Sequence, residues 1–145
     1  LFRDKIDEIM EQVKCPVAVF VNRRYREGAT VSFVLGGMID AFLFSYLEKM
    51  LQNGHLIRLF LFDTDDEEFR GCIDDLQARY PGQTVIVWFE GVEDLVTKEK
   101  DGLLIMSHLS YTKLSEDEAV IRELSSLLVI RRNKNTGDKN EGLEN

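Results

Sequence analysis

The chain has 145 residues, of which 44% are hydrophobic and 30% are charged, a composition typical of one globular domain with a sizeable core. Acidic residues outnumber basic ones by 26 to 18, and the resulting formal net charge of -8 argues against a nucleic-acid partner, because such binding depends on clustered lysine and arginine. No apolar run approaches the roughly 18 residues of a membrane span, since the nearest, residues 38–51, contains Asp40, Glu48 and Lys49.

The spacing of apolar residues predicts helices and strands that alternate along the chain. Residues 2–13 form the first expected helix, which must end before Pro16, and the apolar run at 17–21 predicts a strand covered on both faces. Further strands are expected at residues 30–35, 56–62, 84–89, 102–107 and 127–130. The helices expected between them are residues 39–53, one capped by residues 63–65 and stopped by Pro81, a short piece at 92–98, and one that starts at the capping-box sequence 115–118.

Strands separated by helices of this length predict βαβ crossovers. We therefore expect an α/β fold, a mainly parallel sheet of five to six strands with helices on both faces. Residues 30–132 are expected to form this domain, and the polar residues 133–145 to form a flexible tail.

The first residues echo the end of this domain. Residues 1–23 form a charged amphipathic helix that leads into an apolar strand and finishes in arginine, as the residues before Arg132 do. The chain begins on Leu1 with no signal-peptide pattern. We expect residues 1–23 to be the closing helix and strand of a preceding unit in a longer polypeptide.

The candidate ligand-binding residues lie at the carboxyl ends of the expected strands, because ligands in open parallel sheets bind beyond these ends. Gly36, Gly37, Asp63 and Ser107 hold such positions. The glycine pair could let backbone amides approach a phosphate. A tight strand-to-helix turn explains the same pair without any ligand, and no glycine-rich nucleotide motif accompanies it.

The sequence offers no catalytic centre. Ser107 and His108 are adjacent on an extended segment, so their side chains point to opposite faces and cannot act together as nucleophile and base. Cys15 and Cys72 are expected to be buried, reduced thiols, and no metal-ligand spacing links them to histidines. The acidic run 63–68 is better explained as carboxylates at a helix start than as a cation site. We expect no enzymatic activity, no metal and no cofactor.

Two residues widen the apolar stripe of the helix expected at residues 39–53. Phe44 and Leu51 extend the stripe beyond what one sheet face usually covers. We therefore expect this pair to contribute to a self-association surface, and a homodimer is possible.

The order of expected elements over residues 30–132 resembles that of the universal stress protein family. The resemblance implies a five-stranded parallel sheet, and members of that family often bind ATP. ATP-binding members carry a glycine-rich phosphate loop after the fourth strand, whereas residues 107–117 of this chain contain no glycine. Gly36 and Gly37 also stand where those members place an aspartate. The resemblance thus implies the fold without that mode of ATP binding.

Two segments resemble the cytoplasmic C-terminal regions of monovalent cation:proton antiporters, namely residues 15–23 (CPVAVFVNR) and 34–41 (VLGGMIDA). The resemblance implies a non-catalytic regulatory or assembly domain whose partner is the membrane domain of the parent sodium/proton antiporter. It places the chain at the cytoplasmic face of the inner membrane, as a soluble segment that does not itself insert. The alternative is a universal-stress-like sensor of a nucleotide or other small ligand, with Gly36, Gly37 and Asp63 at its site.

Overall fold

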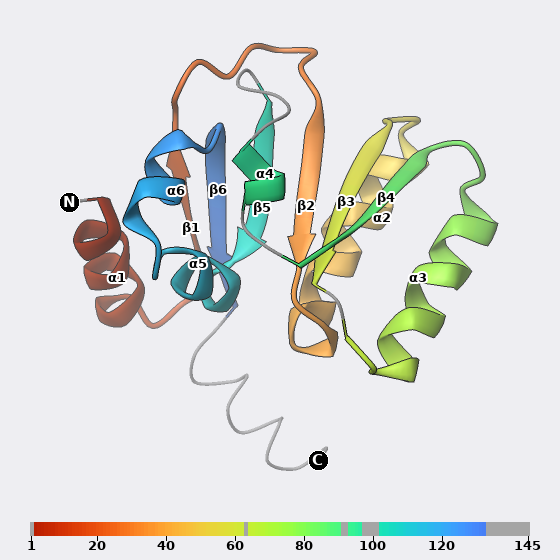
Figure 1. Cartoon of the computed structure of the whole chain (residues 1–145), viewed down its shortest axis with the longest axis horizontal. Coiled ribbons are helices and arrows are strands. Elements are labelled where there is room, and N and C mark those ends of the chain that lie inside the picture. Colours follow the sequence, from red (N-terminus) through yellow and green to blue (C-terminus); the bar gives the residue numbers. More distant parts are fainter. Residues whose placement is uncertain (1, 63, 91–92, 97–101, 133–145) are drawn as a thin grey trace.

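The computed structural model describes residues 2–62, 64–90, 93–96 and 102–132, and their core is a six-stranded sheet of order β1-β6-β5-β2-β3-β4 (Figure 1). The strands are β1 (Val17–Val21), β2 (Val31–Leu35), β3 (Ile57–Phe62), β4 (Thr84–Phe89), β5 (Leu103–Ser107) and β6 (Ser126–Arg131). The helices are α1 (Phe2–Gln12), the 3-10 helix η1 (Met38–Leu43), α2 (Phe44–Gln52), α3 (Glu67–Arg79), α4 (Glu93–Val96), α5 (His108–Leu114) and α6 (Glu118–Glu123).

All strand pairs from β6 to β4 are parallel, whereas β1 pairs with β6 in the antiparallel sense. The predicted α/β fold with a mainly parallel sheet is therefore confirmed, with six strands. The strand expected at residues 17–21 lies at one edge of the same sheet as residues 30–132. Its descent from a preceding unit stays a prediction.

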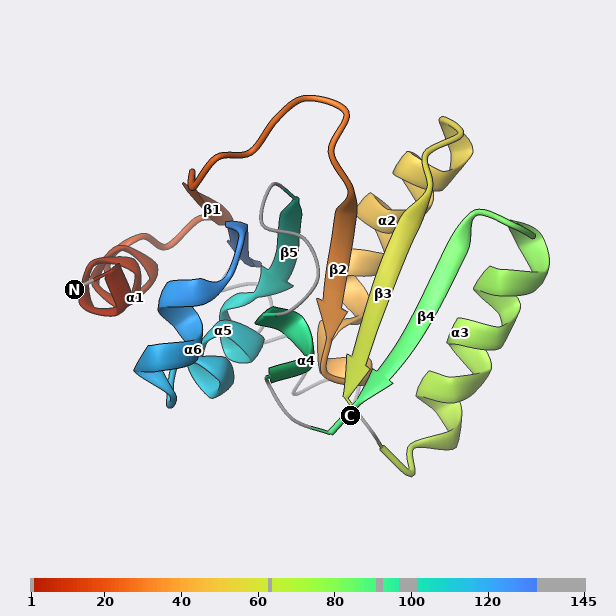
Figure 2. The same ribbon diagram turned by 45° about the horizontal axis from the view of Figure 1, so that its top comes forward.

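Helices cover both faces of the sheet, as expected. In Figures 1 and 2, α4, α5 and α6 lie on one face and α2 lies behind β3 on the other. One apolar cluster joins residues of α1, α5 and α6 to sheet residues such as Val34, Met106 and Val129. The other joins α2 and α3 to Phe33, Leu59 and Ile105. The alternation of side chains along each strand divides the core into these two layers.

Several helix boundaries differ from the sequence-based expectation because side-chain caps compete over a few residues. The side chain of Asp66, one residue beyond the expected caps, accepts hydrogen bonds from the N–H groups of Glu68 and Phe69 and starts α3. Asp117 starts α6 in the same way, so the capping box predicted at Ser115 is wrong. Helix α5 was not expected at all.

The two cysteines occupy different environments. Cys15 is exposed and Cys72 is half-buried, so the expectation of two buried thiols is wrong. Cys15 follows the end of α1, where the chain turns toward β1 and no core covers it. Within the described ranges, no helix has both the length and the hydropathy that crossing a bilayer requires.

Candidate functional site

The candidate site lies where the strand order of the sheet reverses. Strands β2 and β5 are neighbours, but the chain leaves β2 toward β3 and leaves β5 toward β6, on the other side. Ligands in open α/β sheets usually bind at such a reversal, beyond the carboxyl ends of the two strands. Gly36 directly follows β2, and Ser107 ends β5. The structure therefore brings Gly36, Gly37 and Ser107 together at the carboxyl ends of the central strands β2 and β5.

A buried aspartate side chain lies at the carboxyl ends of these two strands. Asp40 lies in η1 and is 0% exposed. Its Oδ2 accepts a hydrogen bond of 2.6 Å from the N–H of Gly36 and one of 3.0 Å from the hydroxyl of Ser110. Its Oδ1 is also buried and has no hydrogen-bond partner among the described residues. The carboxyl group in this position links the turn after β2 to the helix after β5.

Ser107 has a structural role at the same place. It caps the N-terminus of α5, because its Oγ accepts a hydrogen bond of 3.1 Å from the N–H of Ser110. The hydroxyl of Ser110 in turn donates to Asp40. Ser107 and Ser110 are both buried, so the hydroxyl groups and the carboxylate form one network shielded from water.

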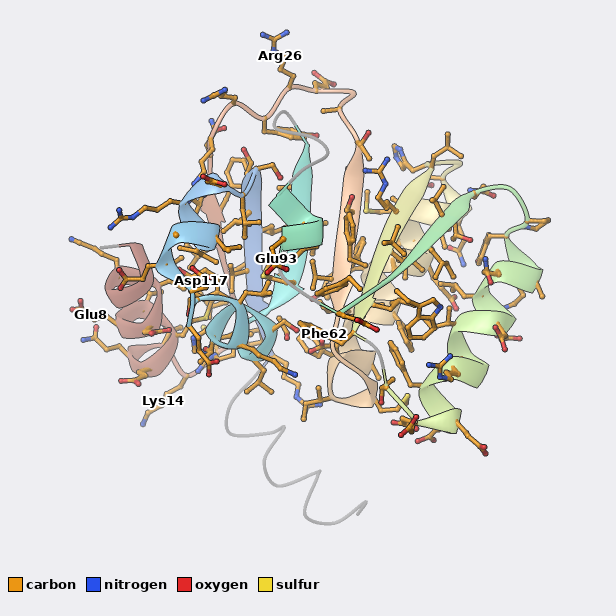
Figure 3. The ribbon with its side chains drawn as sticks, in the orientation of Figure 1. Glu8, Lys14, Arg26, Phe62, Glu93 and Asp117 are labelled. Atoms are coloured by element: carbon orange, nitrogen blue, oxygen red, sulfur yellow. The ribbon has the colours of Figure 1, made fainter. Side chains whose placement is uncertain are left out.

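Aromatic side chains border the site on the β3 and β4 side. Figure 3 shows Phe62 at the carboxyl end of β3, between the sheet and the helices in front of it. Its ring lies 4.6 Å from the ring of Phe89, and Nζ of Lys113 lies 4.6 Å above it. Asp63, the fourth candidate residue, lies outside the described residues.

Gly36 allows these groups to approach one another. A Cβ atom at this position would lie 3.2 Å from Oδ2 of Asp40 and 3.3 Å from Oγ of Ser110. Gly37 has a φ of +131°, a backbone conformation that other residues rarely adopt. The glycine pair therefore builds a tight turn onto a buried carboxylate, which is the ligand-free explanation of this motif.

We expect Gly37→Ala to lower the free energy of unfolding by about 1–2 kcal/mol, because alanine is strained at this positive φ. Gly71→Ala in α3 is the matched control, since its Cβ meets nothing within 4 Å, and it should be stabilising by up to about 1 kcal/mol. Urea denaturation of both variants measures the difference. Equal effects of the two substitutions would contradict this account of the turn.

Ser107 and His108 do not form a nucleophile–base pair. Nε2 of His108 lies 2.8 Å from Oδ1 of Asp7 in α1, so its imidazole faces that helix. The Oγ of Ser107 is used within α5. The structure thus separates Ser107 from His108, although it does so at a helix start and not on an extended segment. No group of three potential metal-ligating side chains occurs among the residues described.

The two candidate interface residues lie against the core of their own chain. Leu51 is 1% exposed, and Phe44 is half-buried with its ring stacked 6.4 Å from that of Phe69. Helix α3 covers the part of the stripe that seemed too wide for the sheet alone. An apolar groove of about 290 Å³ lies instead beside Tyr46 and Met50, on the side of α2 that faces Leu128.

Sequence reasoning did not select Asp40 or Ser110, although they complete the site. The available signal was an aspartate three residues after a glycine pair and within an otherwise apolar run. A charge in such a run is usually exposed, and only the fold shows that it is buried. Comparison of the chain with protein-family models, curated proteins and solved structures found no match.

Proposed function

We propose that this chain is a non-catalytic regulatory or assembly domain of a monovalent cation:proton antiporter. The observation that carries the proposal is the carboxylate of Asp40 at the switch point of the sheet. Its Oδ2 takes the N–H of Gly36 and the hydroxyl of Ser110. Backbone and hydroxyl donors of this kind bind phosphate in nucleotide sites. Here they already donate to the side chain of Asp40, so they are not available to a phosphate.

The antiporter assignment is supported by the likeness of residues 15–23 and 34–41 to antiporter C-terminal regions. Asp40 belongs to the second of these segments. A domain without a catalytic or nucleotide site influences a transporter only if its interaction free energy differs between transporter states. Its function then depends on surfaces, and the groove beside Tyr46 and Met50 is one of them.

Titration calorimetry tests the part of the proposal that the chain does not bind nucleotides. ATP, AMP and cyclic dinucleotides are each expected to give flat traces with the native chain, because the phosphate donors are occupied by Asp40. Asp74→Ala, an exposed change in α3, is the control for unspecific effects of charge. Saturable micromolar binding of any of these nucleotides would favour the sensor and contradict the proposal.

The antiporter half is tested in the full-length gene product that carries this chain. We expect sodium- or potassium-dependent proton flux in everted membrane vesicles, measured by dequenching of a pH-sensitive dye. Gly37→Ala in the same protein should change the cation dependence of that flux with unchanged membrane insertion, because it strains this domain alone. A product that shows no cation-dependent proton flux would contradict the assignment.

One observation favours the alternative, a small-ligand sensor. Oδ1 of Asp40 is a buried acceptor with no partner among the described residues, and a cation would satisfy it. Thermal unfolding with sodium, potassium, magnesium and calcium ions separates the two functions. A ligand at 100 times its Kd stabilises the folded state by about 2.7 kcal/mol, whereas the regulatory domain should show no ion-specific shift.

A further inference from the structure

The two strands at one end of the sheet belong to similar units. Strand β1 follows helix α1, strand β6 follows helix α6, and the two strands pair in the antiparallel sense from Val17↔Arg131 to Val21↔Leu127. Both helices contribute to the same apolar cluster, through Ile6 and Met10 in α1 and through Ile121 in α6. Two similar units that pair in this way are related by a local two-fold axis between the strands.

Each unit contributes an arginine that binds the helix end of the other. Arg23, just after β1, donates from Nη1 to the carbonyls of Ile121 (2.6 Å) and Leu124 (3.0 Å) at the end of α6. Arg131, at the end of β6, binds the end of α1. It donates to the carbonyls of Met10 (2.6 Å) and Cys15 (2.8 Å) and also to that of Val13.

These contacts place positive charge at the negative ends of two helix dipoles. Burial lowers the pKa of the Arg23 guanidinium from its usual value, an effect that Tyr111 partly offsets. An arginine remains protonated despite such a shift. Each unit therefore holds the other through a charged arginine that is partly shielded from water.

The register of the strands agrees with the same axis. When the two units are aligned so that Arg23 matches Arg131, Phe20 matches Leu128. Phe20 and Leu128 are also direct partners in the strand pairing, so the two-fold axis passes between them. Phe20 is 49% exposed, and Leu128 lies next to the groove beside α2. The connection from helix to strand is longer in the first unit, residues 13–16, than in the second, residues 124–125.

We propose that the edge of β6 covered by α1 and β1 is a two-fold docking surface for the β6 edge of a second copy of this chain. Within the monomer, the α1–β1 unit occupies the position that α6 and β6 of the second copy would take in the dimer. When α1–β1 is displaced, two β6 strands pair about Leu128, and each Arg131 binds the carbonyls of Ile121 and Leu124 in the other copy, as Arg23 does now. This inference deepens the assembly role proposed above.

The monomer favours the exchange of this unit for three reasons. Strand β1 is at the edge of the sheet and has one neighbouring strand, whereas β6 has two. The long connection between β1 and β2, residues 22–30, gives the unit room to leave. Exchange of an equivalent element between protomers recreates contacts that already exist and therefore needs no new surface.

Two arginine variants separate this proposal from simple loss of stability. Arg23→Ala weakens only the monomer, because the second copy supplies Arg131 in its place. We expect its dimer fraction, measured by light scattering after size-exclusion chromatography, to rise about tenfold or more over the native chain, since charged hydrogen bonds are lost. Arg131→Ala also loosens α1, but it removes the dimer contact as well, so this variant should remain monomeric.

A cysteine at the axis tests the geometry. In a background with Cys15→Ser and Cys72→Ala, Leu128→Cys with Arg23→Ala should form a disulfide-linked dimer under mild oxidation. Leu128→Cys alone should not, because Phe20 faces that position. Far-ultraviolet circular dichroism verifies that each variant is folded, and Met10→Asp, which detaches buried α1 directly, provides a second route to the dimer.

The proposal is overturned by either of two results. One is that folded Arg23→Ala and Met10→Asp both remain monomers that do not cross-link through residue 128. The other is that Arg131→Ala dimerises as readily as Arg23→Ala. Failure of this test leaves the calorimetric and transport predictions unaffected, so the two proposals are distinguishable.

Discussion

Replacing Asp40 with alanine is expected to lower the free energy of unfolding by about 3 kcal/mol, because it leaves one buried and one partly buried donor without an acceptor. The N–H of Gly36 and the hydroxyl of Ser110 both donate to Oδ2 of a side chain that is 0% exposed. The hydroxyl of Ser110 is buried and the N–H of Gly36 is partly buried, so neither donor regains full hydration in the variant. Urea denaturation followed by circular dichroism measures the change.

A double-mutant cycle shows whether the loss comes from this network. Ser110→Ala removes one of the two donors, so the two single changes should sum to about 1 kcal/mol more than the double variant costs. Asp74→Ala, on the exposed side of α3, should stay within about 0.5 kcal/mol of the native protein. An Asp40→Ala variant as stable as Asp74→Ala would show that the carboxylate does not hold the turn.

Replacing Arg131 with alanine is expected to lower the free energy of unfolding by about 2–4 kcal/mol, because hydrogen bonds from a charged donor contribute more than neutral ones. The guanidinium of Arg131 binds the carbonyls of Met10, Val13 and Cys15, which would otherwise be unpaired at the end of α1. Hydrogen exchange should therefore accelerate at the amides of α1 more than at those of α3.

Two further arginine variants provide the comparison. Arg131→Lys keeps the charge but cannot bind three carbonyls with one planar fork, so it should recover only part of the lost stability. Arg122→Ala changes an exposed arginine of α6 and should have an effect within about 0.5 kcal/mol. Unchanged exchange in α1 of the Arg131→Ala protein would contradict the role assigned to this residue.

The strands were predictable because each is a short, nearly unbroken apolar run between polar turns. Runs such as residues 17–21 and 84–89 coincide with β1 and β4. Helix starts were less predictable, because several acidic and hydroxyl side chains in succession can each serve as a cap. Asp66 and Asp117 start their helices, although neighbouring residues have similar propensities.

The site was predictable in position but not in content. Gly36, Gly37 and Ser107 were selected because they lie at the carboxyl ends of strands, and the sheet does bring them together. Their partner Asp40 was not selected, since its hydrogen bond to Ser110 joins residues 70 positions apart. No local pattern records such a contact. The interface expectation for Phe44 was based on the width of the helix stripe, and α3 accounts for that width.

The sequence by itself therefore determined the alternation of helices and strands, the mainly parallel sheet and the turn at Gly36 and Gly37, because these depend on neighbouring residues. It also revealed that the first residues resemble the last. Only the tertiary structure decided that β1 and β6 pair in the antiparallel sense, that Arg23 binds the end of α6 and that Arg131 binds the end of α1. The reason is that those contacts join residues 98 to 121 positions apart, and their geometry follows from the whole sheet.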